Sequence, residues 1–261
     1  MQWLLQEFED TQKLAEALER LGVGYTWHKV VPFVGDLIPA PDIRGPDDVV
    51  LFGAYTLWRY AKAHDLRPGV FKLTPFVDEA AWHPFLLNGA ASMFLTLRDV
   101  PGHLAEMNRD YFMRPVDDGK EQPGRVRSAE EIVALAKKAL ALNEAEIPLG
   151  SLRHDTLLMF SEPVRILKEW RIWAVDGQIV TWSQYKEGSR VVYRHTIDDD
   201  ALAFAQRMVD INPDYSPAYV LDICRTDDGL KLLETNCLNA AGFYAADLQK
   251  LVQAIESLGA R

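Results

Sequence analysis

Two acidic side chains and one amide stand in a stretch that otherwise reads as an apolar β-hairpin. The segment YVLDICRTDDGLKLLETN, residues 219–236, carries Asp222, Glu234 and Asn236 among Val, Leu and Ile. Such groups are costly to bury unless something pairs with them. Their oxygens are hard ligands that suit magnesium or manganese, and magnesium usually shares its shell with substrate phosphates. These residues therefore indicate a metal-assisted nucleotide site; the alternative is an exposed hairpin with a solvated acidic face.

The turn decides whether the three side chains share a face. Asp227-Asp228-Gly229 fits a three-residue loop, a type I turn ended by a left-handed glycine. That loop places Asp222 directly opposite Glu234, with Asn236 on the same face. The other face then receives Leu221, Ile223 and Leu233. A two-residue loop at Asp228-Gly229 would put the acids on opposite faces. Facing carboxylates repel each other, and a divalent cation between them reverses the sign of that interaction.

Two arginines in strand-like segments could meet a phosphate. Arg114 lies in YFMRPV and Arg171 in KEWRIW. A guanidinium in an apolar strand needs an anionic partner, and it can bind phosphate through two parallel hydrogen bonds. The partner is either a protein carboxylate such as Glu169 or a ligand phosphate. Weaker candidates for the same role, since most loop lysines are solvated, are Lys120, Lys168, Lys186 and Arg190.

The first hundred residues alternate strand and helix patterns. The strands expected here are MQWLLQE, YTWHKVVPF and VVLFGAY. A helix is expected over Thr11–Leu21, capped by Asp10 or Thr11 and followed by Gly22, and a second helix runs through Ala63. LIPAPDIRGPDD reads as a loop. The alternation predicts a small three-layer α/β domain with a parallel sheet over residues 1–105.

Residues 106–261 read as an α+β domain with antiparallel hairpins. Strands are expected at DYFMRPV and TLLMFSEPV, and EWRIWAVDGQIVTWSQY forms a hairpin with a two-residue turn at Asp176-Gly177. SAEEIVALAKKAL is an amphipathic helix with a capping box of Ser128 and Glu131. Further helices are expected at DDDALAFAQRMVDI and, after the acidic hairpin, from Asp247 to Leu258.

Composition narrows the class of protein. The chain has 261 residues, 48% hydrophobic and 25% charged, with a net charge of -10. That charge disfavours general nucleic-acid binding. No run of 18 apolar residues spans a membrane, and MQWLLQEFEDTQ lacks the basic region of a signal peptide. The two cysteines, Cys224 and Cys237, are not cross-strand partners and are expected as reduced thiols of a cytoplasmic protein.

Three stretches together resemble the ATP-grasp enzymes, and most closely a clade of that superfamily found in phages and bacteria. They are YFMRPVDDGKEQPG, FSEPVRILKEWRIWAVDGQIVTWSQY and LDICRTDDGLKLLETNCLNAAGFYAAD. The resemblance covers roughly residues 105–250. It implies an ATP-grasp nucleotide-binding domain with an antiparallel sheet at 106–261, preceded by a pre-ATP-grasp-like domain at 1–105.

The resemblance also implies roles for individual residues. Asp222, Glu234 and Asn236 match the family's magnesium ligands. Arg114 stands where the family usually has a phosphate-contacting lysine before proline, and VDDGKEQPGRV with Lys120 stands where a phosphate lid is expected. The inter-subdomain hinge, whose backbone meets adenine, falls at Ser161, Glu162 and Val164. Lys168, Glu169 and Arg171 fall in a motif that faces ribose and phosphate.

The activity implied is ATP-dependent, ADP-forming ligation of a small-molecule or peptide carboxylate to an amine through an acyl phosphate. Magnesium, with manganese as a possible substitute, and Arg171 and Arg114 would spread the charge of the transferring phosphoryl group. A phosphotransferase on the same fold is one alternative. A nucleotide-binding module without catalysis is another, and the complete ligand set argues against it.

Overall fold

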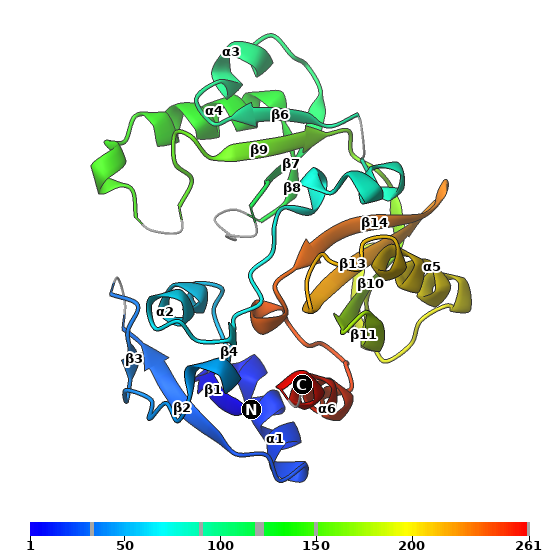
Figure 1. Ribbon diagram of the computed structural model, residues 1–261. Coiled ribbons are helices and arrows are strands. Elements are labelled where there is room, and N and C mark those ends of the chain that lie inside the picture. Colours follow the sequence, from blue (N-terminus) through cyan, green and yellow to red (C-terminus); the bar gives the residue numbers. More distant parts are fainter. Residues whose placement is uncertain (32–33, 89–90, 118–122, 149–150, 260–261) are drawn as a thin grey trace. The chain divides into compact units, whose positions relative to one another are not determined.

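The chain forms two compact units in the computed structural model, which describes residues 1–31, 34–88, 91–117, 123–148 and 151–259. Unit 1 consists of Met1–Phe76 and Ile166–Arg261, and unit 2 is Val77–Arg165 (Figure 1). These borders differ from the predicted division at residues 105 and 106. The reason lies in the pairing described below, since strands on both sides of residue 105 share one sheet.

Unit 1 begins with the predicted small sheet. Its strands, in the spatial order β3-β2-β1-β4-β5, are Leu37–Ile38, Tyr25–Val30, Gln2–Gln6, Val49–Phe52 and Pro68–Gly69. β1, β2, β4 and β5 pair in parallel, and only β3 is antiparallel. Trp3 and Phe52 face a core shared with helix α1, Glu9–Arg20, whereas Leu4 and Leu51 face helix α2, Leu57–Ala63. Helices therefore cover both faces, as the sequence predicted.

Two local predictions in this region are wrong. Helix α1 begins at Glu9, before the predicted caps, because Phe8 is the residue that precedes the first turn. The Thr11 hydroxyl instead accepts a hydrogen bond from the Phe8 N–H at 3.0 Å. The expected loop LIPAPDIRGPDD contains β3 and a 3-10 turn at Pro46–Asp48. The helix end is as predicted, since Gly22 follows it with φ 68°.

The larger sheet of unit 1 is entirely antiparallel. Its strands, in the order β12-β11-β10-β13-β14, are Arg190–Arg194, Gln178–Glu187, Ile166–Val175, Ala218–Thr226 and Gly229–Asn236. β10 and β11 are joined by the predicted two-residue turn, with φ 53° at Asp176 and 71° at Gly177. Helix α5, Asp199–Asp210, contacts β11, β13 and β14. Helix α6, Leu248–Gly259, contacts β10, β11 and α1, which joins both sheets to one core.

Unit 2 is a separate antiparallel sheet with its own core. Its strands, in the order β6-β9-β7-β8, are Met93–Thr96, Leu157–Ser161, Asp110–Pro115 and Arg125–Ser128. Helix α3, Val100–Leu104, contacts helix α4, Ala129–Leu140. Both helices contribute to the core beneath β6, β7 and β9. The predicted capping box of α4 is confirmed, since Ser128 and Glu131 exchange hydrogen bonds of 3.0 and 3.2 Å. Short 3-10 segments lie at Phe76–Asp78, Ala80–Phe85, Glu144–Glu146 and, in unit 1, Leu238–Ala240.

Over the described part of the chain, none of the helices combines the length and apolarity that crossing a membrane requires.

Candidate functional site

The acidic hairpin β13–β14 has the predicted pairing but a different turn. Asp222 lies opposite Glu234 and Val220 opposite Asn236. The loop, however, has only two residues, since Thr226 pairs with Gly229. A β-bulge compensates: the partners of Asp222 and Ile223 are Glu234 and Leu232, so Leu233 has no register partner. The bulge supplies the one-residue shift that the sequence reading assigned to the loop.

The bulge also changes which leucine faces the core. Leu232, opposite Ile223, is fully buried, whereas Leu233 is only partly buried. The prediction that Leu233 shares the face of Ile223 is therefore wrong. The extra residue lets the apolar face and the polar face both stay continuous along the hairpin.

The three predicted metal ligands converge. The Asn236 Nδ2 donates to Asp222 Oδ2 at 3.2 Å and to Glu234 Oε1 at 3.1 Å, so one amide group bridges the two carboxylates. Asp222 is fully buried and Asn236 is nearly so. Burial raises the pKa of Asp222 from 3.8 to about 6; Arg171 opposes this shift and the nearby Glu234 adds to it. Two carboxylates held together in this way form a locally anionic group that a cation would relieve.

Arg171 of β10 is the cation that the protein itself places beside Asp222. The two residues are register partners on β10 and β13. Arg171 Nε donates to Oδ1 at 2.9 Å and Nη2 to Oδ2 at 2.7 Å, a two-point ion pair shielded from solvent. Burial by itself would lower the pKa of Arg171, but the charge and hydrogen bonds of Asp222 raise it above its usual value. Of the two partners expected from the sequence, the protein carboxylate is found, but it is Asp222 and not Glu169.

Glu169 has a different partner. Its Oε1 lies 2.8 Å from Nζ of Lys186 on β11, and Glu169 is 5% exposed. The pairing of β10 with β11 passes from Glu169–Lys186 to Trp170–Gln184, which leaves Tyr185 as an extra residue in a second β-bulge. Because of this bulge, Tyr185 and Lys186 both reach the side of the sheet that carries Glu169 and Arg171.

Three stacked tyrosines cover Arg171, and the sequence reading missed all of them. Tyr244 stacks on Tyr185, with ring centroids 5.3 Å apart, and on Tyr193 of β12 at 5.0 Å. The Arg171 guanidinium lies 4.9 Å from the Tyr244 centroid and 5.7 Å from that of Tyr185. Burial raises the pKa of Tyr185 well above 10. Only the motif letters of AAGFYAAD pointed to this loop, and nothing in strand alternation predicts the bulge that turns Tyr185 toward it.

Lys168 belongs to another cluster. Its Nζ lies 3.0 and 2.9 Å from the two oxygens of Asp198, which also accepts a hydrogen bond from Arg225 at 3.2 Å. Both cations stand over the ring of Trp170. Residues 168 and 170 alternate with 169 and 171 along β10, so Lys168 and Arg171 point to opposite faces of the strand.

The remaining predicted residues lie in unit 2, where they end neighbouring strands. Arg114 of β7 is half-buried and its Nε donates to the Pro115 carbonyl at 3.1 Å. Ser161 ends β9 and is 2% exposed, and its hydroxyl has no hydrogen-bond partner among the described residues. Glu162 is exposed and pairs with Arg109 at 3.3 Å. Val164 is 41% exposed. Lys120 and part of the expected phosphate lid fall outside the described residues.

The two cysteines are buried free thiols, as expected. Cys237, beside Asn236, donates to Asn239 Oδ1 at 3.5 Å. Burial, followed by the charge of Glu169, raises the pKa of Cys224 to about 12. Asn239 itself was missed: its amide bonds the Leu51 and Gly69 carbonyls and the Phe71 N–H, and so fastens the segment after the hairpin to the parallel sheet.

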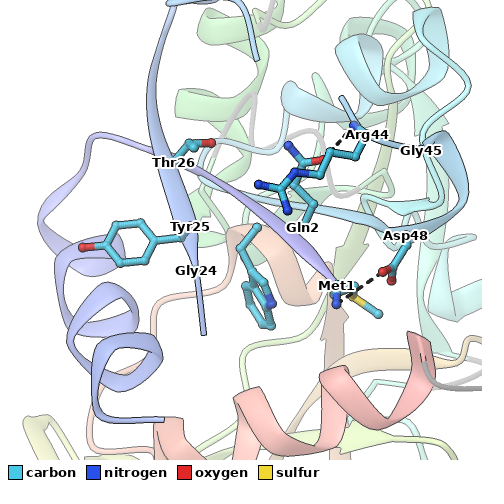
Figure 2. Close-up of a pocket in the computed structure, with 9 residues that line it drawn as sticks. Met1, Gln2, Gly24, Tyr25, Thr26, Arg44, Gly45 and Asp48 are labelled. Atoms are coloured by element: carbon cyan, nitrogen blue, oxygen red, sulfur yellow. Dashed lines mark hydrogen bonds and ion pairs between the residues drawn. The ribbon is translucent and has the colours of Figure 1, made fainter. Parts of the chain in front are cut away.

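A cavity of about 610 Å³ lies elsewhere in unit 1, at the amino ends of the parallel strands. Figure 2 shows Met1, Gln2, Tyr25, Arg44 and Asp48 around it. No residue predicted for the site lines this cavity, so it is distinct from the acidic cluster.

A divalent cation fits the acidic cluster by the chemistry of its donors. Among the described residues, His, Cys, Asp and Glu side chains form no group of three or more suited to a metal. A cation would therefore depend on Asn236 as its third protein ligand, together with Asp222 and Glu234. The bridging position of the Asn236 amide between the carboxylates shows that all three reach a common point. Oxygen donors of this kind suit magnesium.

Comparison with known proteins places this fold. The chain is similar in structure to the D-alanine–D-alanine ligase from Bacillus anthracis complexed with ATP (TM-score 0.63, 10% identity, 100% of this chain and 99% of that one). It is also similar to the D-cycloserine synthetase DcsG (TM-score 0.60, 15% identity, 99% and 100%) and to the ATP-grasp ligase PsnB complexed with minimal precursor (TM-score 0.53, 16% identity, 100% and 99%). No curated protein matches the sequence closely enough to count as a relative.

A family model provides the decisive match. The model of an ATP-grasp domain, the third family of its clade, matches residues 53–255. The resemblance inferred from the sequence motifs is thereby confirmed, as are the mixed α and β content and the antiparallel sheets of the fold. Since the match spans well over half of the chain, the protein belongs to this family of ATP-grasp domains.

Proposed function

We propose that the protein is an ATP- and magnesium-dependent ligase that joins a carboxylate to an amine and forms ADP. The observation that carries this proposal is the buried group of Asp222, Glu234 and Asn236, bridged by one amide and backed by Arg171, within an ATP-grasp domain. A protein that bound its ligand without a metal would not need two facing carboxylates at this position.

The residues would divide the work as follows. Asp222, Glu234 and Asn236 would hold Mg²⁺, or Mn²⁺ in its place; when bound, the ion would spread the negative charge of the transferring phosphoryl group. Arg171 would act through Asp222, because both carboxylate oxygens of Asp222 already accept its hydrogen bonds. Glu169 and Lys186 would line the same face.

The residues of unit 2 would bind the nucleotide. We assign Arg114 and Lys120 to the phosphates, and Ser161, Glu162 and Val164 to the adenine. The buried Ser161 hydroxyl, unpartnered among the described residues, supports a ligand contact at the end of β9. Lys168 is the weakest of the expected nucleotide contacts, because its ammonium already pairs with both oxygens of Asp198.

The reaction would proceed in two displacements. A substrate carboxylate oxygen would attack the γ-phosphorus, forming an acyl phosphate as the bond from that phosphorus to the ADP oxygen breaks. The amine nitrogen would then attack the acyl carbon, and inorganic phosphate would leave with the electrons of the C–O bond while the amine proton passes to solvent. Such chemistry depends on positioning and charge stabilisation more than on proton transfer.

The substrates are proposed only as a class. The similar structures include a D-alanine–D-alanine ligase and a ligase complexed with a minimal precursor, so we propose an amino acid or a peptide as carboxylate and an amine as acceptor. We further propose that residues 1–105 correspond to a pre-ATP-grasp-like domain and 106–261 to the ATP-grasp domain. Two buried free thiols are consistent with a cytoplasmic protein.

Thermal unfolding with ATP tests the first step. ATP with Mg²⁺ should stabilise the protein by about 2.7 kcal/mol at one hundred times the dissociation constant. ATP with EDTA should do less, and so should GTP, because we expect backbone groups to select adenine. The matched variants are E234Q and E187Q, the second changing an exposed glutamate that pairs with Arg194. The metal-dependent shift should vanish only in E234Q.

A substrate screen tests the reaction itself. Carboxylates and amines are supplied in pairs, and ADP, phosphate and the coupled product are measured together. Ligation releases one phosphate for each ADP and product; phosphate that stays on a substrate would identify a phosphotransferase. If no ATP stabilisation and no turnover were found, the proposal would be refuted.

A further inference from the structure

Tyr244 holds an uncommon backbone conformation in the middle of the tyrosine stack. Its φ is 51°, in the left-handed region that residues with side chains seldom occupy. Such conformations persist where the surroundings over-determine them, and they gather at functional sites. The turn directs the ring between those of Tyr185 and Tyr193.

Three hydrogen bonds fasten the loop on both sides of Tyr244. Before it, the Gly242 carbonyl accepts a hydrogen bond from Arg171 Nη1 at 3.4 Å. After it, the Ala245 N–H donates to Ser183 Oγ at 3.2 Å, and the Asp247 N–H donates to Thr181 Oγ1 at 2.7 Å. The ring is therefore held relative to β10 and β11 and cannot move away without breaking this set.

The Tyr244 ring closes off the guanidinium of Arg171. Arg171 Nε and Nη2 are bound to Asp222, and Nη1 is directed to Gly242. The guanidinium carbon lies 4.9 Å from the Tyr244 centroid, within the range of a cation–π contact. The hydrogen bonds fix the direction of the guanidinium, and the ring restrains its plane.

We propose that Tyr244 is a positioning residue for Asp222, acting through Arg171. The Tyr244 ring restrains the guanidinium plane, and the two-point ion pair passes that restraint to the Asp222 carboxylate, which bonds the Asn236 amide on its other side. Groups that orient ligands from behind commonly change metal affinity by 10–100-fold when they are altered. The consequence for metal binding rests on the proposed function; the restraint on Arg171 does not.

The test replaces the ring without disturbing the backbone. Glycine accepts a positive φ, so Y244G keeps the loop path and removes only the ring. Y244F keeps the ring and removes the hydroxyl. Y193A removes the outer ring of the stack, which is 58% exposed and lies against Tyr244 on the edge strand. Melting curves of all three establish that each variant is folded.

The first measurement uses the metal-free protein. The Arg171 Nε–H, assigned by triple-resonance spectroscopy, should give a sharp and slowly exchanging signal in the wild type, Y244F and Y193A. In Y244G it should broaden or exchange at least tenfold faster. An unchanged Arg171 signal in Y244G would overturn the inference, as would an equal change in Y193A.

The second measurement is Mg²⁺ affinity by calorimetry with ADP present. Y244G should bind Mg²⁺ about tenfold more weakly, with Y244F and Y193A within about twofold of the wild type. Wild-type-like affinity in Y244G would contradict the proposed coupling to the ligands. Should the wild type itself bind no magnesium, the proposed function fails while the Arg171 signal still decides the restraint.

Discussion

Arg171 and Asp222 face each other across β10 and β13 and join through two hydrogen bonds of 2.9 and 2.7 Å, with 7% and 0% of their surfaces exposed. A pair so deeply buried is held by mutual need, since neither charge has water to solvate it. Asp222 has two neighbours of opposite character, the Arg171 cation and the Glu234 carboxylate. The pair therefore leaves one negative charge of the three uncompensated, in the position where a divalent cation is proposed.

Removing Arg171 should destabilise the fold. R171A leaves the Asp222 carboxylate buried and unpaired, and the expected loss is about 3–5 kcal/mol in the free energy of unfolding. Urea denaturation measures it. The double variant R171M/D222L replaces both charges by apolar groups and should recover most of the loss. A loss under about 0.5 kcal/mol in R171A would show that Arg171 is not a structural partner of Asp222.

Removing Arg114 should act mainly on the nucleotide. Arg114 is half-buried at the end of β7, so R114A should change stability by no more than about 1 kcal/mol. Loss of a charged hydrogen-bond donor to phosphate should weaken ATP binding by about tenfold or more. Calorimetric titration with ATP measures the affinity, and R190A, an exposed arginine on β12, is the matched control. Equal ATP affinity in R114A and the wild type would remove Arg114 from the site.

Neutralising Glu234 should separate stability from activity. E234Q removes the repulsion between the facing acids, so the metal-free protein should be unchanged or more stable by a few tenths of a kcal/mol. ATP turnover should be abolished or greatly reduced, because a bound ion would lose a charged ligand. Melting temperature and ADP formation are compared with those of E187Q. A stability loss in E234Q with turnover retained would mark Glu234 as a structural acid.

Acid should weaken magnesium binding through Asp222. The pKa of this group is raised from 3.8 to about 6 in the folded protein. Its protonation therefore favours the folded state: that contribution is complete below pH 3.8 and is lost as the pH rises through 6. Magnesium must compete with this proton, so its affinity should fall as the pH drops below about 6. Calorimetry between pH 5 and 8 measures this, and a flat profile would contradict the assignment of Asp222 as a ligand.

The same titration has a signature in the metal-free protein. The stability difference between the wild type and D222N should change between pH 7 and 5, with the wild type gaining relative to the variant as the pH falls. Urea denaturation at both values measures this difference. A constant difference would indicate that Asp222 keeps its charge over this range.

The sequence predicts the elements of the fold well because apolar periodicity and turn residues are local signals. The two-residue turn at Asp176-Gly177, the Ser128 cap and the parallel strands of the small sheet all follow from neighbouring residues. The facing of Asp222 and Glu234 is confirmed, although for a different reason than expected. A bulge at Leu233, rather than a longer loop, sets the register. Bulges leave little trace in sequence, because they depend on packing against both faces.

The cluster around the acids was only partly predictable for the same reason. Arg171 and Asp222 are 51 positions apart and meet through strand pairing, which a single sequence does not reveal. The bulge at Tyr185 and the left-handed turn at Tyr244 bring the tyrosines together, and neither residue type announces such a conformation. The assignments in unit 2, Arg114 and Ser161 to Val164, stay predictions until a nucleotide complex is studied.

The burial of both cysteines makes the protein ready for spectroscopic labelling. The chain has two cysteines, neither is exposed, and the pKa of Cys224 is raised to about 12, so maleimide reagents should leave the native protein unmodified. A cysteine introduced at Val191, which is 68% exposed on the edge strand and pairs with Lys186, would then carry a single dye. Such a probe would report on the tyrosine-covered face in real time, with no need to remove the native thiols first.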